Sequence, residues 1–277
     1  MKKYLRNIYY LLKKTTSVNA TLSNSSPLLN YINPADLLPL EKLLRLGTNY
    51  GGWIIPSNSL LNGDSICYLA GAGEDISFDC ELVQRFGCKV RIIDPTPRAI
   101  EHFRQLSDSV LNWKRFPVNN SNTNFYTLTR EHLDHLTFLA KGIADRDTEM
   151  KFFFPKNPDH ISCSTVNIQK TADFFKADCL RLSTMMKLLG DKNVDLLKLD
   201  IEGGEYAVIK DMMTLGVLPR ILLVEFDEIH TPLDGDASLR IKKSFDLLKE
   251  AGMRCVCVEG SNATFVSPVL RHDLCDR

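Results

Sequence analysis

The chain has 277 residues, of which 44% are hydrophobic, so it is long enough to bury a sizeable core. Its 34 Lys and Arg residues equal its 34 Asp and Glu residues in number, which removes a general electrostatic attraction to nucleic acid or to an anionic membrane surface. We therefore expect one large α/β domain with a lead-in segment, and no nucleic-acid partner.

The eight cysteines contain no CxxC pair and no Cys/His spacing typical of zinc. Several of them, such as Cys67 and Cys179, fall in or beside apolar segments, as reduced thiols of a protein core do. The cysteines therefore indicate a reducing compartment, and we expect a cytoplasmic protein.

Residues 1–60 are interpreted as a helical lead-in and linker before the main domain, 61–277. Residues 1–14 have the basic, partly apolar pattern of a helix, but their apolar run is far too short to span a bilayer, so no transmembrane segment is predicted. The spacing in 39–46 predicts a short amphipathic helix. The glycine- and aromatic-rich stretch 47–56 is expected to be a loop that packs on the main domain as part of a pocket wall.

A strand, a glycine turn and a helix start follow one another between Ser65 and Asp79. Gly71 and Gly73 allow a sharp turn and close approach of a ligand, and the free N–H groups of the helix start attract a carboxylate or phosphate. The turn is therefore a candidate cofactor cradle, with a plain βα turn as the alternative. Ile76 replaces the third glycine of the dinucleotide fingerprint GxGxxG, which argues against a nicotinamide cofactor.

From this turn onward the pattern alternates between strand and helix, as in a doubly wound parallel sheet. The last two apolar runs flank a Ser-Asn turn and predict an antiparallel hairpin. We thus expect an α/β fold with a mostly parallel seven-stranded sheet that ends in a C-terminal antiparallel hairpin. Parallel strands are expected within 65–70, 89–94, 136–144, 194–205 and 220–230, helices at 76–86, 98–106, 179–189 and 239–251, and the hairpin within 253–268.

Two further predictions concern the stretch between 136 and 168. The strand within 136–144 is expected to form a hairpin with the aromatic run 150–154, across a charged turn. The irregular stretch 155–168 is rich in turn formers and is expected to lie as a loop over a pocket.

An aspartate closes the second strand of the expected sheet. Asp94 lies where an acid can hold the two hydroxyls of a ribose, at the carboxyl end of a strand next to the glycine turn. Because Asp before Pro is common in turns, a helix cap or a turn aspartate is the alternative. The end of the third strand, Gly142 to Asp145, is expected to border the adenine of the same ligand.

Three segments together resemble one family: GAG after the first strand, IIDPTP after the second and DLLKLDIEGGE on the fourth. They are similar to the FkbM-type S-adenosylmethionine-dependent methyltransferases, whose fourth-strand motif reads close to D-x-x-K-x-D-x-E-G-x-E. The resemblance covers roughly 51–268 and implies a Rossmann-like class I methyltransferase fold, S-adenosyl-L-methionine as cofactor, and O-methylation of a small molecule or a sugar or glycan. The motif is matched here by Asp195, Lys198, Asp200, Glu202, Gly203 and Glu205.

The sequence departs from the family in its first motif. The family usually has an acid two residues before the first glycine and a glycine at the position of Asp75, whereas this chain has Leu69 and Asp75. We therefore expect Glu74 or Asp75 to contact the methionine ammonium from the helix start. The expected cofactor-binding residues are Gly71, Ala72, Gly73, Glu74, Asp75, Asp94, Pro95, Ala144, Asp145 and Asp200.

Methyl transfer from a sulfonium is an in-line displacement, so the site must hold the methyl carbon against the acceptor oxygen and remove the hydroxyl proton. Lys198, Asp200 and Glu202 share one face of the fourth strand, because alternate strand residues point to the same side. Ligands in open α/β sheets lie beyond the carboxyl ends of strands, which places Asp200 and Glu202 at the pocket. Lys198 lies deeper, and we expect it to be the ionic partner of a carboxylate rather than a base.

The fifth strand brings further polar side chains, including Glu225 and Asp227, to the same rim. Histidine is the usual general base of proteins, so His230 is the candidate base, with a structural hydrogen bond as the alternative. A second interpretation of these carboxylates is that they bind a divalent ion such as magnesium, which prefers oxygen ligands. The alternative to a metal site is that the acids after the strands cap helices. The expected catalytic residues are Asp200, Glu202, Glu225 and His230, and no metal ligand is assigned.

Two other functional classes stay open at this point. A non-catalytic module that keeps the fold and the cofactor is favoured by Leu69, while the acids of the fourth strand and His230 argue against it. A nicotinamide oxidoreductase is disfavoured by Ile76 and by the terminal hairpin. The sequence holds no signal for the identity of the acceptor or for the oligomeric state.

Overall fold

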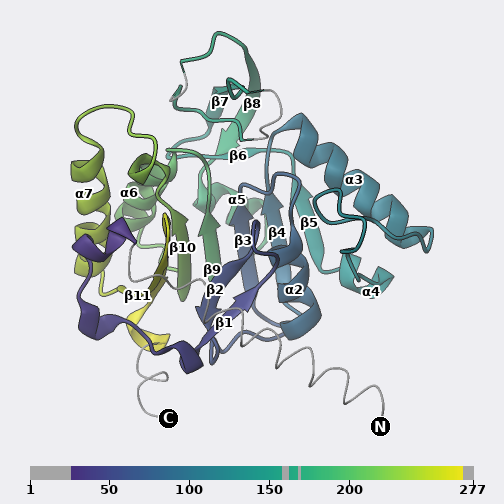
Figure 1. Ribbon diagram of the computed structural model, residues 1–277, viewed down its shortest axis with the longest axis horizontal. Coiled ribbons are helices and arrows are strands. Elements are labelled where there is room, and N and C mark those ends of the chain that lie inside the picture. Colours follow the sequence, from purple (N-terminus) through teal and green to yellow (C-terminus); the bar gives the residue numbers. More distant parts are fainter. Residues whose placement is uncertain (1–25, 158–161, 168–169, 271–277) are drawn as a thin grey trace.

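The computed structural model describes residues 26–157, 162–167 and 170–270, so the helix expected at 1–14 lies outside the described residues. The largest sheet has seven strands in the order β11-β12-β10-β9-β3-β4-β5 (Figure 1). Its strands are β3 (Ile66–Ala70), β4 (Lys89–Ile93), β5 (Leu136–Leu139), β9 (Leu196–Leu199), β10 (Ile221–Glu225), β11 (Arg254–Glu259) and β12 (Asn262–Val266).

The first five of these strands run parallel to one another, and β12 pairs antiparallel with both β10 and β11. The mostly parallel seven-stranded α/β sheet predicted from the sequence is therefore confirmed. The strands form because short apolar runs are bounded by turn residues, and β3 and β9 are buried along their whole length, as strands covered on both faces are.

Helices cover both faces of the sheet. One core cluster joins Leu69 and Ile92 of the strands to α2 and α3, and the other joins Tyr68 and Leu197 to α5, α6 and α7. Successive strand residues thus contribute to opposite cores. The helices are α2 (Ser77–Phe86), α3 (Pro97–Leu111), α4 (Arg130–Leu133), α5 (Leu182–Leu189), α6 (Glu205–Leu215) and α7 (Ala237–Glu250), with 3-10 turns η1 (Pro27–Tyr31), η2 (Pro34–Asp36), η3 (Leu40–Lys42) and η4 (Asp227–Ile229).

The amphipathic helix predicted at 39–46 is wrong. After η3 the chain forms β1 (Leu43–Leu46), which pairs antiparallel with β2 (Trp53–Pro56). Leu43 and Leu46 are both buried, because this pair of strands packs on the core of the main sheet, and that long-range packing overrides the helical spacing. Within the described ranges, no helix is long and apolar enough to cross a membrane.

The strand predicted within 136–144 is divided between two sheets. Its first part is β5, and its end is β6 (Gly142–Ile143), which belongs to a three-stranded sheet in the order β6-β8-β7. The hairpin predicted between 136–144 and 150–154 is wrong, because β7 (Thr148–Phe153) pairs antiparallel with β8 (Phe174–Leu180), where Phe152 stacks on Phe175. The helix predicted from residue 179 begins only at Leu182, since the preceding residues belong to β8. This small sheet lies above the main sheet in Figure 1.

Candidate cofactor and catalytic site

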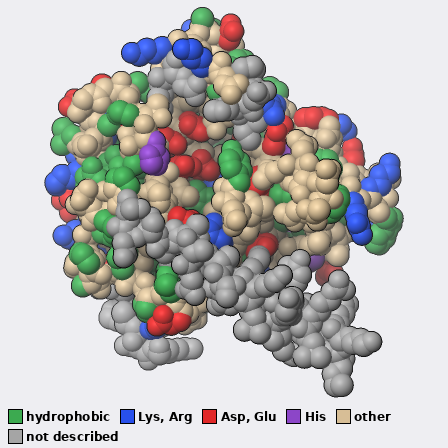
Figure 2. Space-filling view, in the orientation of Figure 1, with side chains coloured by type: hydrophobic (Ala, Val, Ile, Leu, Met, Phe, Trp, Pro, Cys, Tyr) green, Lys and Arg blue, Asp and Glu red, His purple; other side chains and the backbone are tan. Residues whose placement is uncertain are grey.

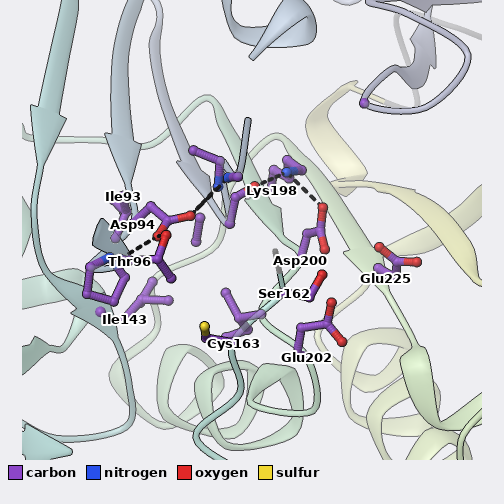
Figure 3. A pocket seen from close by; sticks show the side chains of 18 of the residues that line it. Ile93, Asp94, Thr96, Ile143, Ser162, Cys163, Lys198, Asp200, Glu202 and Glu225 are labelled. Carbon is purple, nitrogen blue, oxygen red and sulfur yellow. Dashed lines mark hydrogen bonds and ion pairs between the residues drawn. The ribbon is translucent and has the colours of Figure 1, made fainter. Parts of the chain in front are cut away.

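A cavity of about 250 Å³ lies at the carboxyl ends of β3, β4 and β9. Figure 2 shows a hollow below the small sheet in which acidic side chains gather. Figure 3 shows the carboxylates Asp200, Glu202 and Glu225 together on one side of the cavity, away from Asp94. The cavity therefore has an acidic end and a second end beside β4.

The glycine turn holds the ends of three strands together. Gly71 has a φ of 84°, and a Cβ atom on it would lie 1.7 Å from the backbone oxygen of Asp200, so only glycine fits. The Gly71 N–H donates to the oxygen of Ile93 at 3.0 Å, and the Asp200 N–H donates to the oxygen of Ala70 at 3.2 Å. The turn thus forms one wall of the cavity.

Asp94 ties this turn to the end of β4. Its Oδ2 accepts the N–H groups of Ala72 and Gly73 at 2.9 and 3.0 Å, and its Oδ1 accepts the N–H and the hydroxyl of Thr96 at 2.8 and 2.6 Å. A carboxylate has about four lone-pair sites, and these four donors occupy them. Pro95 lines the cavity beside Asp94. The role of Asp94 as a ribose ligand stays a prediction.

The two acids expected at the methionine ammonium have other partners. Asp75 lines the cavity, but its Oδ2 accepts hydrogen bonds from Thr48 Oγ1 and Asn119 Nδ2, both at 2.6 Å. Glu74 instead lines a neighbouring open groove, where both its oxygens accept hydrogen bonds from Arg98 at 2.9 and 2.7 Å. Asp75 therefore fastens the β1–β2 turn over the cavity, and Glu74 points outside it.

The acidic end of the cavity contains the ion pair that the sequence predicts. Lys198 Nζ lies 2.9 Å from Asp200 Oδ2 and also donates to the backbone oxygen of Gly71. Burial alone would lower the pKa of Lys198, but the carboxylates of Asp200 and Asp79 raise it above its usual value. Lys198 therefore stays charged and is unavailable as a base.

Glu225 lies near this ion pair and has a raised pKa. Burial, together with the nearby Asp200 carboxylate, raises the pKa of Glu225 to about 9, and the Ser261 hydroxyl donates to its Oε1 at 3.0 Å. Burial likewise raises the pKa of Asp227 to about 10, with Glu205 and Glu202 adding to the shift. Glu225 and Asp227 are thus neutral at pH 7.

Not all expected site residues meet in this cavity. Asp227 and His230 lie in a smaller cavity of about 110 Å³ that shares Glu202 and Ser162 with the main one. At the end of the third strand, Gly142 and Ile143 line the main cavity, while Ala144 and Asp145 are not among its lining residues. In the part of the chain that the structure describes, no group of three or more His, Cys, Asp or Glu residues could hold a metal ion.

Several lining residues were not predicted individually. Tyr50 and Trp53 come from the stretch that was expected to form a pocket wall, and Ser162 and Cys163 come from the loop that was expected to lie over the pocket. Tyr50 is 74% exposed at the mouth, whereas Trp53 is buried with the Lys198 ammonium 5.7 Å from its ring centre. Burial raises the pKa of the Cys163 thiol to about 11, so it is a neutral, weakly polar wall.

Comparison with known proteins identifies the family. The model of the methyltransferase FkbM domain matches residues 70–255, which is more than half of the chain and includes the glycine turn, Asp94 and the acidic fourth-strand motif. No curated protein matches the chain. Because the match covers more than half of the chain, the chain belongs to the FkbM methyltransferase family.

Proposed function

We propose that this protein is an S-adenosyl-L-methionine-dependent O-methyltransferase on a Rossmann-like class I fold with a C-terminal antiparallel hairpin, and that it acts on a hydroxyl of a small molecule or of a sugar or glycan. The observation that carries the proposal is the cavity at the carboxyl ends of β3, β4 and β9, where the glycine turn meets the acidic motif. Ligands of open α/β sheets bind at this place.

The residues present fit the cofactor at both ends. Gly71 lets the turn lie against the Asp200 backbone, where any Cβ would clash, and Ile93, Pro95 and Ile143 supply apolar walls for a purine. Asp94 is proposed to face the ribose hydroxyls, although its four existing donors make bracing of the turn its larger task. When bound, the cofactor supplies an electrophilic methyl group next to a positive sulfur.

The acidic end is proposed to face the methionine part and the acceptor. Asp200 and Glu202 line the cavity there, and carboxylates attract both an ammonium and a sulfonium. Glu74 lines a neighbouring groove and Asp75 holds the β1–β2 turn, so we assign the ammonium contact to Asp200, whose Oδ2 also pairs with Lys198. Tyr50 and Trp53 line this end, with Trp53 buried beside the Lys198 ammonium and Tyr50 exposed at the mouth.

Removal of the acceptor proton is proposed to fall on a side chain other than Glu225. Glu225 already holds a proton at pH 7, so it cannot accept another, and we give it the role of a hydrogen-bond donor. Asp200 and Glu202 are the other carboxylates at the acidic end of the main cavity. His230 lies in the adjoining smaller cavity, where it can act on an acceptor that extends past Glu202.

The cofactor assignment is tested by thermal unfolding with S-adenosylhomocysteine or NAD at equal concentration. A ligand that binds only the native state raises the unfolding temperature. We expect S-adenosylhomocysteine to raise the unfolding temperature and NAD to leave it unchanged. A rise with NAD alone would contradict the proposal. Transfer of a labelled methyl group to a panel of hydroxylated acceptors then tests the reaction.

A non-catalytic cofactor-binding module is the second candidate function. Leu69 stands where the family usually has an acid, and Asp75 and Glu74 are engaged elsewhere, so the usual ammonium contact is missing. Cofactor binding without methyl transfer to any acceptor of a broad panel would favour this reading over the enzyme.

We also propose a reducing, cytoplasmic location. The cysteines that the structure describes are free thiols, and all of them except Cys163 are buried. Buried, unpaired thiols are common where disulfides do not form. Fractionation of the cells that make the protein tests this location.

A further inference from the structure

The turn between β9 and α6 contains a strained residue at the cavity. Glu202 has a φ of 56°, a left-handed conformation that is uncommon for a residue with a side chain of this size. Its side chain lines both the main and the smaller cavity, and Figure 3 shows it beside Ser162. Strained backbone persists only where surrounding contacts fix it, and it is frequent at functional sites.

Glu205, the first residue of α6, supplies those contacts. Its side chain is fully buried, and its Oε1 accepts the N–H of Ile201 at 2.9 Å and the N–H of Gly203 at 3.2 Å. These two N–H groups lie on either side of Glu202 along the chain. From the small-sheet side, the Ser164 hydroxyl donates to the backbone oxygen of Glu202. The main chain of the strained residue is therefore held at three points.

The chemical state of Glu205 suits this task. Its second oxygen, Oε2, is buried and has no hydrogen-bond partner, and burial raises the pKa of the group to about 8. Burial therefore favours the neutral carboxyl, in which one oxygen carries the proton while the other accepts both N–H groups. A glutamine side chain has the same shape and the same accepting oxygen.

We propose that Glu205 is a positioning residue, whose carboxyl oxygen holds the turn in its left-handed form and thereby places Glu202 at the junction of the two cavities. Glu205 itself lines neither cavity. The inference rests on the proposed function only in taking that junction as the place where cofactor and acceptor meet. The alternative is that Glu205 is a buried acid with no particular effect on Glu202.

A double-mutant cycle separates the two readings. Glu205→Met keeps the volume but removes the accepting oxygen, and Glu202→Gly removes the strain, because glycine adopts positive φ freely. We expect E205M to lower the unfolding midpoint in urea strongly when residue 202 is Glu, and by less than half as much in the E202G background. E205Q is expected to behave like the unmodified protein, since it keeps the accepting oxygen.

The matched control is Met212→Ala, on the same helix, which removes a buried side chain far along α6 from the turn. Its loss of stability is expected to be equal in both backgrounds. If E205M lowers the unfolding midpoint equally in both backgrounds, or if E205Q lowers it as much as E205M does, the positioning role is wrong. Both outcomes are read from folded variants, because Met and Gln fit the space of Glu.

Two further readouts connect the turn to the site. Hydrogen exchange of the Gly203 amide is expected to be slow in the unmodified protein, E205Q and M212A, and at least tenfold faster in E205M. Equal exchange in all four proteins would contradict the proposal.

Calorimetry with S-adenosylhomocysteine is expected to show weaker binding to E205M than to M212A. If the unmodified protein does not bind this ligand, the proposed function fails, while the exchange rates and the cycle still decide the role of Glu205.

Discussion

The ammonium of Lys198 on β9 bridges the Asp200 carboxylate, at 2.9 Å, and the backbone oxygen of Gly71 in the turn after β3. One cation thus joins the acidic fourth-strand motif to the glycine turn. Because Lys198 is only 6% exposed, this bridge is shielded from solvent, and it fixes the spacing between the two walls of the cavity.

Replacement of Lys198 by Met should therefore destabilise the protein. The variant leaves Asp200 without its cationic partner, and loss of one member of a buried pair costs about 3 kcal/mol, reduced to about 2 kcal/mol because Asp200 is partly exposed. The double variant K198M/D200N should recover much of this loss. Urea unfolding at pH 7 measures both, and equal stability of K198M and the unmodified protein would contradict the bridge.

Gly71→Ala should abolish ligand binding. The added Cβ would lie 1.7 Å from the Asp200 oxygen, so the turn and β9 must separate. Gly190→Ala is the matched control, because Gly190 also has positive φ (71°) but no heavy atom within 4 Å of the added Cβ. We expect G190A to fold with a loss of about 1 kcal/mol and to bind S-adenosylhomocysteine normally. Normal binding by G71A would show that the turn does not shape the site.

Asp75→Ala should weaken S-adenosylhomocysteine binding by releasing the β1–β2 turn. The substitution removes the hydrogen bonds from Thr48, Asn119 and the Ser77 N–H, of which the first holds Tyr50 and its neighbours over the cavity. We expect a roughly tenfold loss of affinity in calorimetry, equivalent to about 1.4 kcal/mol. Asp64→Ala, at an exposed position, is the control; if D75A binds as tightly as D64A, the turn is not part of the site.

Stability should fall as the pH rises from 6 to 9. Burial raises the pKa of Glu225 from its usual 4.5 to about 9, so between these values the folded protein binds a proton that the unfolded chain has released. Stability then decreases with pH by up to about 1.4 kcal/mol per pH unit for each such group.

Glu225→Gln should make this decline shallower, because glutamine cannot ionise. Urea unfolding at pH 6 and pH 9 provides the comparison. If E225Q and the unmodified protein lose the same stability between the two pH values, the raised pKa of Glu225 is not the cause of the decline.

Much of the main sheet could be predicted because its strands are short, continuous apolar runs that need no knowledge of their partners. The runs that contain Leu69 and Leu197 are buried along their whole length in the structure, whereas the run that contains Ile92 leaves Lys89 exposed. The small sheet could not be predicted in this way. Its pairing of Phe153 with Phe174 joins segments far apart in the chain, and nothing local specifies that register.

The site shows the same division. Gly71, Asp94 and Asp200 could be placed at one cavity, because each follows a strand and the carboxyl ends of parallel strands meet. The partners of Asp75 could not be predicted, since Thr48 and Asn119 reach it from distant loops. Those long-range hydrogen bonds, rather than any local pattern, decide that Asp75 holds a loop.

Titration calorimetry of the full chain with S-adenosylhomocysteine, and separately with NAD, tests the central claim most directly. The claim is that the cavity between the glycine turn and the acidic motif holds the sulfonium nucleoside. We predict binding of one S-adenosylhomocysteine per chain, lost in G71A and kept in G190A, and no heat from NAD. Absence of S-adenosylhomocysteine binding to the folded, unmodified protein, or binding that G71A leaves unchanged, would contradict it.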